Sequence, residues 1–157
     1  MKHYLAKTLE FTKEGFTDLF ILNTANAPAG WTVGSALTND FSVGFSTQNV
    51  VLTALAAGDA VLGALVDIKT AVVGPSTAPT AQVKTGTGGV AITPTVAVKT
   101  GTGCVTDNTV VGATISTAAE NLVLALAAGG GDGAAATAGE IWVWAKISRA
   151  GRLLTSA

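Results

Sequence analysis

Charged side chains are scarce in this 157-residue chain. Asp, Glu, Lys and Arg make up 12% of it, against about 25% in an ordinary soluble domain. The formal net charge at pH 7 is −1, so the chain lacks the basic surface on which nucleic-acid binding depends. A nearly neutral surface also repels its own copies weakly. We therefore expect a homo-oligomer that binds no nucleic acid; the alternative is a monomer kept soluble by Thr and Ser.

Cysteine and histidine each occur once, as Cys104 and His3. A single cysteine cannot form an intrachain disulfide, which is compatible with synthesis in a reducing compartment. Ser-His-Asp and Cys-His catalysis need an ordered imidazole beside the nucleophile, and zinc sites need several Cys or His ligands. No carboxylate pair stands out either, although Asp59, Asp67 and Glu120 could meet in space. The sequence predicts no enzyme, no metal site and no cofactor.

Long apolar runs are missing as well. The run from Leu122 to Ala128 has seven residues, far short of the about 20 needed to cross a bilayer. The first residues lack the apolar stretch of a secretory signal. We expect no membrane anchor, and we expect the chain to fold in a cytoplasm.

One run of six residues, Val-Lys-Thr-Gly-Thr-Gly, occurs twice, at 83–88 and at 98–103, 15 residues apart. That spacing corresponds to about one strand, a turn and a return strand. A phosphate-binding loop needs its lysine after the glycines and a helix behind it, whereas here the lysine comes first and β-prone sequence follows. The two copies therefore predict a pair of strand-to-turn corners.

Short β-prone runs separated by Gly, Pro and Asn turns fill the rest of the chain, with no sustained helical period. The clearest strand is 60–73, where the even-numbered residues from Leu62 to Thr70 form the better core face. Strict alternation predicts a closing strand at 140–148, with Ile141, Val143, Ala145 and Ile147 on one side and Glu140, Trp142, Trp144 and Lys146 on the other. Segment 52–57 is either a strand end or one helical turn. Further strands are expected at 16–22, 81–85, 90–93, 95–100, 104–106, 110–116 and 121–127, with two short ones in 31–51 and a flexible loop at 129–139.

This pattern predicts an all-β fold, an antiparallel β-sandwich or jelly roll with an extended N-terminal segment. We expect one domain over 1–157: an N-terminal arm and first strands at 1–48, the sandwich body at 49–150 and a C-terminal tail at 151–157. Residues 2–14 are more charged than the rest of the chain. They are either a short strand or an arm that becomes ordered against a partner.

The aromatic residues are few, and two of them, Trp142 and Trp144, lie on one face of the closing strand. Trp and Tyr are enriched where one protein meets another, so this face is either an interface or part of the sandwich interior. The candidate interface residues are Tyr4, Leu5, Phe11, Phe16, Trp31, Trp142 and Trp144.

The stretch from Ala57 to Val72 opens with Gly-Asp-x-Val-x-Gly and is followed by glycine-rich strands, and Gly139 to Ile147 closes the domain. In these features the chain, over about residues 50–148, resembles the small all-β decoration (cement) proteins of tailed bacteriophage capsids. The resemblance implies a homotrimer, made in the host cytoplasm, that sits on the capsid exterior of the virion, binds the major capsid protein and stabilises the head. It carries over no catalytic residue.

We expect the N-terminal segment to make the contact with the capsid. Two alternatives stay open. One is another virion part, such as a tail or head-fibre protein. The other is a carbohydrate-binding β-sandwich in which Trp142 and Trp144 stack on sugar rings.

Overall fold

The computed structural model describes residues 1–5, 15–23, 48–73, 79–86, 89–99, 103–104, 113–127 and 138–150, with backbone alone at 2–5, 48 and 103–104. Over these ranges the chain has ten strands and no helix, which confirms the all-β prediction. The strands are β1 (Lys2–Leu5), β2 (Asp18–Asn23), β3 (Gln48–Leu55), β4 (Ala60–Val73), β5 (Thr80–Thr85), β6 (Val96–Ala97), β7 (Gly103–Cys104), β8 (Thr114–Ile115), β9 (Glu120–Ala127) and β10 (Ala138–Ser148).

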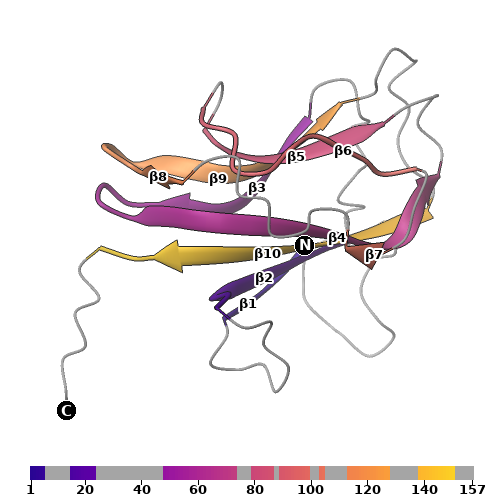
Figure 1. Ribbon diagram of the computed structural model, residues 1–157, viewed down its shortest axis with the longest axis horizontal. Coiled ribbons are helices and arrows are strands. Elements are labelled where there is room, and N and C mark those ends of the chain that lie inside the picture. Colours follow the sequence, from indigo (N-terminus) through magenta and orange to yellow (C-terminus); the bar gives the residue numbers. More distant parts are fainter. Residues whose placement is uncertain are drawn as a thin grey trace, which may run out of the picture.

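These strands form two antiparallel sheets that stack as a sandwich, with β5, β6 and β9 in one layer and β1, β2 and β10 in the other (Figure 1). The six-stranded sheet has the order β1-β2-β10-β4-β7, and β8 also pairs with β4. The four-stranded sheet has the order β3-β9-β5-β6. The chain passes from one sheet to the other six times, between β2 and β3, β3 and β4, β4 and β5, β6 and β7, β8 and β9, and β9 and β10.

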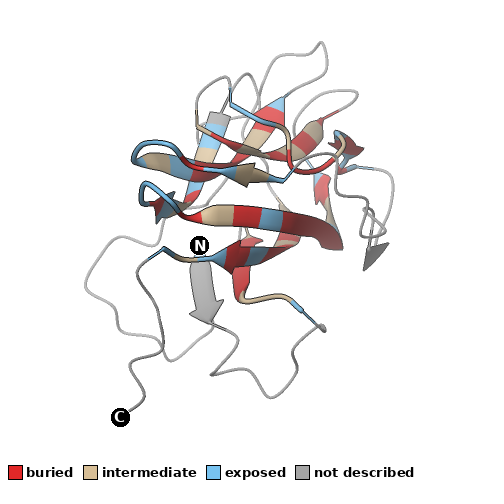
Figure 2. Cartoon of the chain, turned by 60° about the vertical axis from the view of Figure 1, so that its left-hand side comes forward, coloured by how far each residue is buried: buried red, intermediate tan, exposed pale blue. Residues whose placement is uncertain are grey.

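The core lies between the sheets and, among the described residues, is aliphatic apart from the ring of Phe20. Phe20, Ile68 and Ile141 of the six-stranded sheet belong to the same buried cluster as Leu122 and Leu124 of β9. Figure 2 shows buried and exposed positions following one another along the strands. The alternation predicted for the closing strand is confirmed, since every second residue of β10 from Ile141 to Ile147 is in this cluster.

The core face predicted for β4 is correct in the middle of the strand and wrong at its start. Ala64, Val66 and Ile68 belong to the core cluster and Leu65 to the cluster on the opposite face. At the start of the strand, however, Leu62 is 43% exposed and Val61 is buried in its place. The pairing with β10 shifts register between Lys146 and Ile147. Such a β-bulge adds one residue to one strand, and a shift of one residue turns the following side chains to the opposite face. Thr70, also assigned to that face, is exposed.

Several predicted strands are shorter in the structure. Of the two alternatives for segment 52–57, the strand end is confirmed, because β3 continues to Leu55. Segment 90–93 forms a single bridge, between Ala91 and Lys84, and of segment 95–100 only Val96–Ala97, strand β6, is a strand among the described residues. Strands β7 and β8 overlap the segments 104–106 and 110–116, of which residues 105–106 and 110–112 lie outside the described ranges. Of the N-terminal segment, Lys2–Leu5 is a strand paired with β2 rather than a free arm. Segments 6–14, 31–47 and 128–137 lie outside the described residues.

The two copies of the repeat occupy different places. In the first copy β5 ends at Thr85, Gly86 has φ +52°, and the Thr85 N–H donates to the Val90 carbonyl at 3.0 Å, so a strand-to-turn corner is confirmed. The second copy begins at buried Val98 and reaches β7, which pairs with β4. It therefore leads from the four-stranded to the six-stranded sheet; its residues 100–102 are not among those described.

The corner between β3 and β4 explains the Gly-Asp opening of the strand that follows. Gly58 has φ +89°, and its N–H donates to the Ser116 carbonyl at 2.7 Å. A Cβ atom at Gly58 would lie 2.9 Å from the Cβ of Ala150. This position therefore excludes a side chain on two grounds, backbone conformation and space.

A Gly58→Ala variant is expected to lose about 2 kcal/mol of unfolding free energy, measured by urea titration, from strain at positive φ and the contact with Ala150. Gly15→Ala is the matched control: Gly15 has φ +86°, but among the described residues its Cβ would meet only the Lys146 Nζ, at 3.7 Å. Its loss should be smaller, about 1 kcal/mol. Equal losses would contradict the close approach at Ala150.

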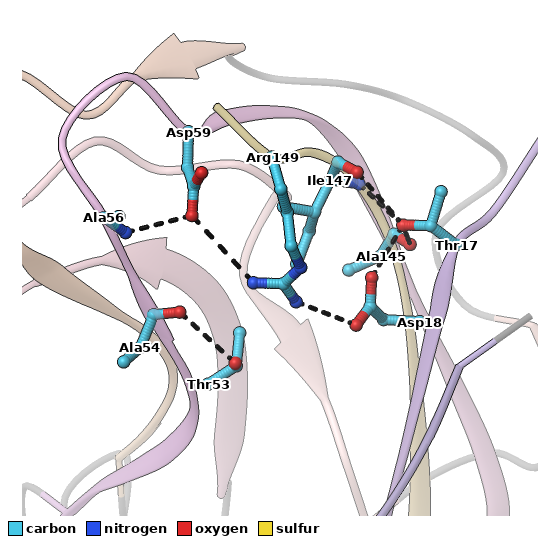
Figure 3. A network of polar contacts seen from close by, with 9 residues as sticks. All are labelled: Thr17, Asp18, Thr53, Ala54, Ala56, Asp59, Ala145, Ile147 and Arg149. Atoms are coloured by element: carbon cyan, nitrogen blue, oxygen red, sulfur yellow. Dashed lines mark hydrogen bonds and ion pairs between the residues drawn. The ribbon is translucent and has the colours of Figure 1, made fainter. Parts of the chain in front are cut away.

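Asp59, the next residue, anchors an ion-pair network at this end of the sandwich (Figure 3). Its carboxylate accepts hydrogen bonds from the N–H groups of Ala56 at 2.9 Å and Ala150 at 2.7 Å. The guanidinium of Arg149 lies between Asp59, at 3.9 Å, and Asp18, at 3.0 Å. Both aspartates are buried. The network ties the end of β10 to the start of β2 and to the corner before β4.

Candidate interaction surface

A second apolar cluster lies on the other face of the six-stranded sheet, away from the sandwich core. Leu19, Leu65 and Trp144 are its buried members, and Phe16, Ile21 and Trp142 are partly buried against them. These six residues are called the outer aromatic face below. An antiparallel sheet commonly presents a polar surface on the side opposite the core, so large apolar side chains here require an explanation other than the sandwich itself.

Cross-strand pairing arranges this face in rows. Residues directly opposite each other in antiparallel strands share a face of the sheet. One row runs over β1, β2, β10 and β4 through Tyr4, Leu19, Trp144 and Leu65, and the neighbouring row runs through Lys2, Ile21, Trp142 and Asp67. The outer aromatic face therefore lies over three adjacent strands, β2, β10 and β4.

The aromatic rings contact one another in tilted pairs. The ring centroids of Phe16 and Trp144 are 6.5 Å apart, and those of Trp142 and Trp144 are 6.2 Å apart, within the range of favourable aromatic pairs. Trp144 is only 6% exposed. Its indole N–H is buried with no hydrogen-bond partner in the part of the chain that the structure describes, and an unpaired buried donor costs stability.

Charged side chains surround Trp142 and hold it in place. The indole N–H of Trp142 donates to Glu140 Oε1 at 2.6 Å. The Nζ of Lys69 lies 4.8 Å from the centre of the Trp142 ring, a cation–π contact, and pairs with Asp67 Oδ2 at 2.6 Å. An ordered aromatic centre with a polar rim is the usual anatomy of a protein–protein interface.

The structure brings together three of the seven interface candidates, namely Phe16, Trp142 and Trp144. Tyr4 occupies the same cross-strand row as Trp144, and Leu5 is paired with Asp18 in the next row. Phe11 and Trp31 lie outside the described residues. Neither Trp142 nor Trp144 packs inside the sandwich, which was one of the two alternatives; both belong to the opposite face of the sheet.

Sequence reasoning missed Leu19, Ile21 and Leu65. A signal for the first two was present, because residues 19–22 are apolar without interruption, and a strand with no polar alternation is typically covered on both faces. Lys69 reaches Trp142 only because β4 pairs with β10, and nothing in the sequence pattern pointed to it. Glu140 lies two residues before Trp142 on β10, so the alternation of the closing strand already places both on one face.

Other surfaces offer less for chemistry. The four-stranded sheet carries a shallow depression of about 270 Å³ that is lined by Asn49, Thr80, Gln82, Lys84, Thr95, Ala125, Leu126 and Ala127. No group of three His, Cys, Asp or Glu residues that could hold a metal ion occurs in the described ranges. Those ranges also contain no helix that could span a membrane.

Comparison with known proteins gives no relative: no protein family, curated protein or solved structure matches this chain. What the fold and the surface define is a two-layered β-protein with an aromatic platform on the outside of its larger sheet.

Proposed function

We propose that the chain is a virion structural protein, a capsid decoration (cement) protein whose outer aromatic face binds the major capsid lattice and stabilises the head. The two segments that carry the resemblance, 57–72 and 139–147, correspond to β4 with its preceding corner and to β10. These are two of the strands under the outer aromatic face. The observation that carries the proposal is this face, because its half-buried members Phe16, Ile21 and Trp142 present apolar area where an antiparallel sheet usually meets water.

Energetic arguments favour a protein partner for this surface. Trp and other large aromatic side chains dominate binding free energy at protein interfaces, above all where they are already ordered. Trp142 is ordered by its hydrogen bond to Glu140 and by the Lys69 contact. Within the described part of the chain the buried indole N–H of Trp144 has no hydrogen-bond partner, and departures of this kind from full pairing are more common at functional sites.

The N-terminal segment has a changed role in this proposal. Since Lys2–Leu5 forms β1 at the edge of the same sheet, it extends the platform. Deleting residues 1–14 would therefore remove a strand and expose the edge of β2. We expect such a deletion to abolish capsid binding, but damage to the sheet and loss of a direct contact would have the same effect. Substitutions on the outer aromatic face are the cleaner test.

The carbohydrate alternative has less support. Sugar-binding tryptophans present open ring faces, whereas Trp144 is 6% exposed and Lys69 lies over the ring of Trp142. A tail or head-fibre protein would use the same kind of surface for another virion protein, so the location of the chain distinguishes that alternative.

The experiment is to add the purified chain to heads of the virus that encodes it, assembled without it, and to measure co-sedimentation. Saturable binding is expected, with no further uptake by heads that already carry the chain. A folded chain that stays in the supernatant at every concentration would contradict the proposal.

A further inference from the structure

β3 is an unusually open edge strand. It has eight residues and forms one side of the four-stranded sheet, where β9 is its only neighbour among the described strands. Its sequence, Gln-Asn-Val-Val-Leu-Thr-Ala-Leu, contains no charged residue and no proline. The other outer strands differ: β1 has four residues including Lys2, and β6, β7 and β8 have two residues each.

An edge strand exposes N–H and C=O groups that can pair with another strand. Proteins usually protect such edges by making them short or by adding lysine, proline or a bulge. β3 has only the last of these, a register shift between Val51 and Thr53. The residues before it, 48–51, form a regular run in which Asn49 is exposed and Val51 is 49% exposed.

We propose that β3 of one copy pairs antiparallel with β3 of a second copy about a twofold axis. The pairing would join two four-stranded sheets into one continuous sheet of eight strands. A second copy of the chain can pair with this edge because the strand carries no charge. When a twofold axis relates two such strands, no like charges face each other across the new ladder. The net charge of −1 adds little repulsion between whole chains.

This contact does not rest on capsid binding, and it differs from the trimer that the resemblance implies. A twofold contact gives an even number of copies, whereas a trimer is odd. Pairing of one short edge buries less area than a standard protein interface, so the dimer should dissociate on dilution. Its presence or absence in solution leaves the test on viral heads unaffected.

The test measures solution mass by analytical ultracentrifugation over a range of micromolar concentrations. The wild-type chain should form dimers that dissociate on dilution. The double variant Asn49→Lys, Val51→Lys should be monomeric throughout, because lysines then face each other across the twofold axis. Ile115→Lys is the matched control: Ile115 is 66% exposed on β8 of the other sheet, so this variant should dimerise as the wild type does.

A charge swap separates pairing from any effect on folding. Asn49→Glu, Val51→Glu should also be monomeric alone, and an equimolar mixture with the lysine variant should restore the dimer. A monomeric wild type, an odd-numbered assembly, or a dimer that persists in the lysine variant would each overturn the proposal. Should the lysine variant lose its β-sheet circular dichroism, hydrogen exchange of the wild type decides: β3 amides protected at high but not at low concentration support the contact, and unchanged protection refutes it.

Discussion

Replacing Asp59 with alanine should lower the free energy of unfolding by about 3 kcal/mol, the largest stability effect that we expect from a single polar side chain here. The buried carboxylate accepts hydrogen bonds from the N–H groups of Ala56 and Ala150 and pairs with Arg149. Truncation leaves both donors unsatisfied and leaves the guanidinium with Asp18 alone. Urea unfolding followed by tryptophan fluorescence measures the change.

Two comparison variants make this expectation specific. Asp59→Asn keeps one acceptor oxygen and should lose roughly half as much, since it removes the charge but only part of the hydrogen bonding. Thr53→Ala, in β3 just before the same corner, removes a hydroxyl that among the described residues donates only to the neighbouring Ala54 carbonyl, at 3.3 Å. It should change stability by less than about 0.5 kcal/mol. If Asp59→Ala cost no more than Thr53→Ala, the network would not hold the corner.

Replacing Trp142 with alanine should weaken binding to capsids by at least about 2 kcal/mol, which is roughly 30-fold in dissociation constant. Trp142 is a half-buried member of the outer aromatic face, and neighbouring side chains hold its ring in a fixed orientation. A partner would cover an aromatic ring that loses little entropy on binding, which is what makes such residues dominate an interface. Binding isotherms from co-sedimentation at constant head concentration give the ratio.

The matched control is Val90→Ala, which also removes exposed apolar area, at a residue 47% exposed beside the four-stranded sheet. It should bind as the wild type does. Circular dichroism melting must show both variants folded at the binding temperature. Equal binding by the Trp142 and Val90 variants would remove the outer aromatic face from the proposed interface.

Local pattern was enough to predict the elements whose burial is regular. The closing strand was predicted because Ile141 to Ile147 alternate strictly with polar and aromatic residues. β4 was predicted with its bounds, Ala60–Val73. The first repeat copy was predicted as a corner because glycines follow a Thr- and Val-rich strand, and Gly86 has the positive φ that such turns use.

The features that sequence could not supply depend on contacts between distant segments. The exposure of Leu62 follows from a register shift against β10, and no residue of β4 signals it. Arg149 and Asp18 are 131 residues apart in the chain, so their pairing is visible only once β2 lies beside β10. The outer aromatic face was half predicted: its tryptophans were named, but the side chains from β2 and β4 that complete it become neighbours only through strand order.

Cryo-electron microscopy of heads loaded with the purified chain tests the central proposal most directly. The proposal predicts ordered density on the outside of the capsid, with the six-stranded sheet turned towards the shell and Trp142 at the contact. Density at the tail alone, no density on the head, or a chain bound to the shell through its four-stranded sheet with the outer aromatic face towards solvent would contradict it.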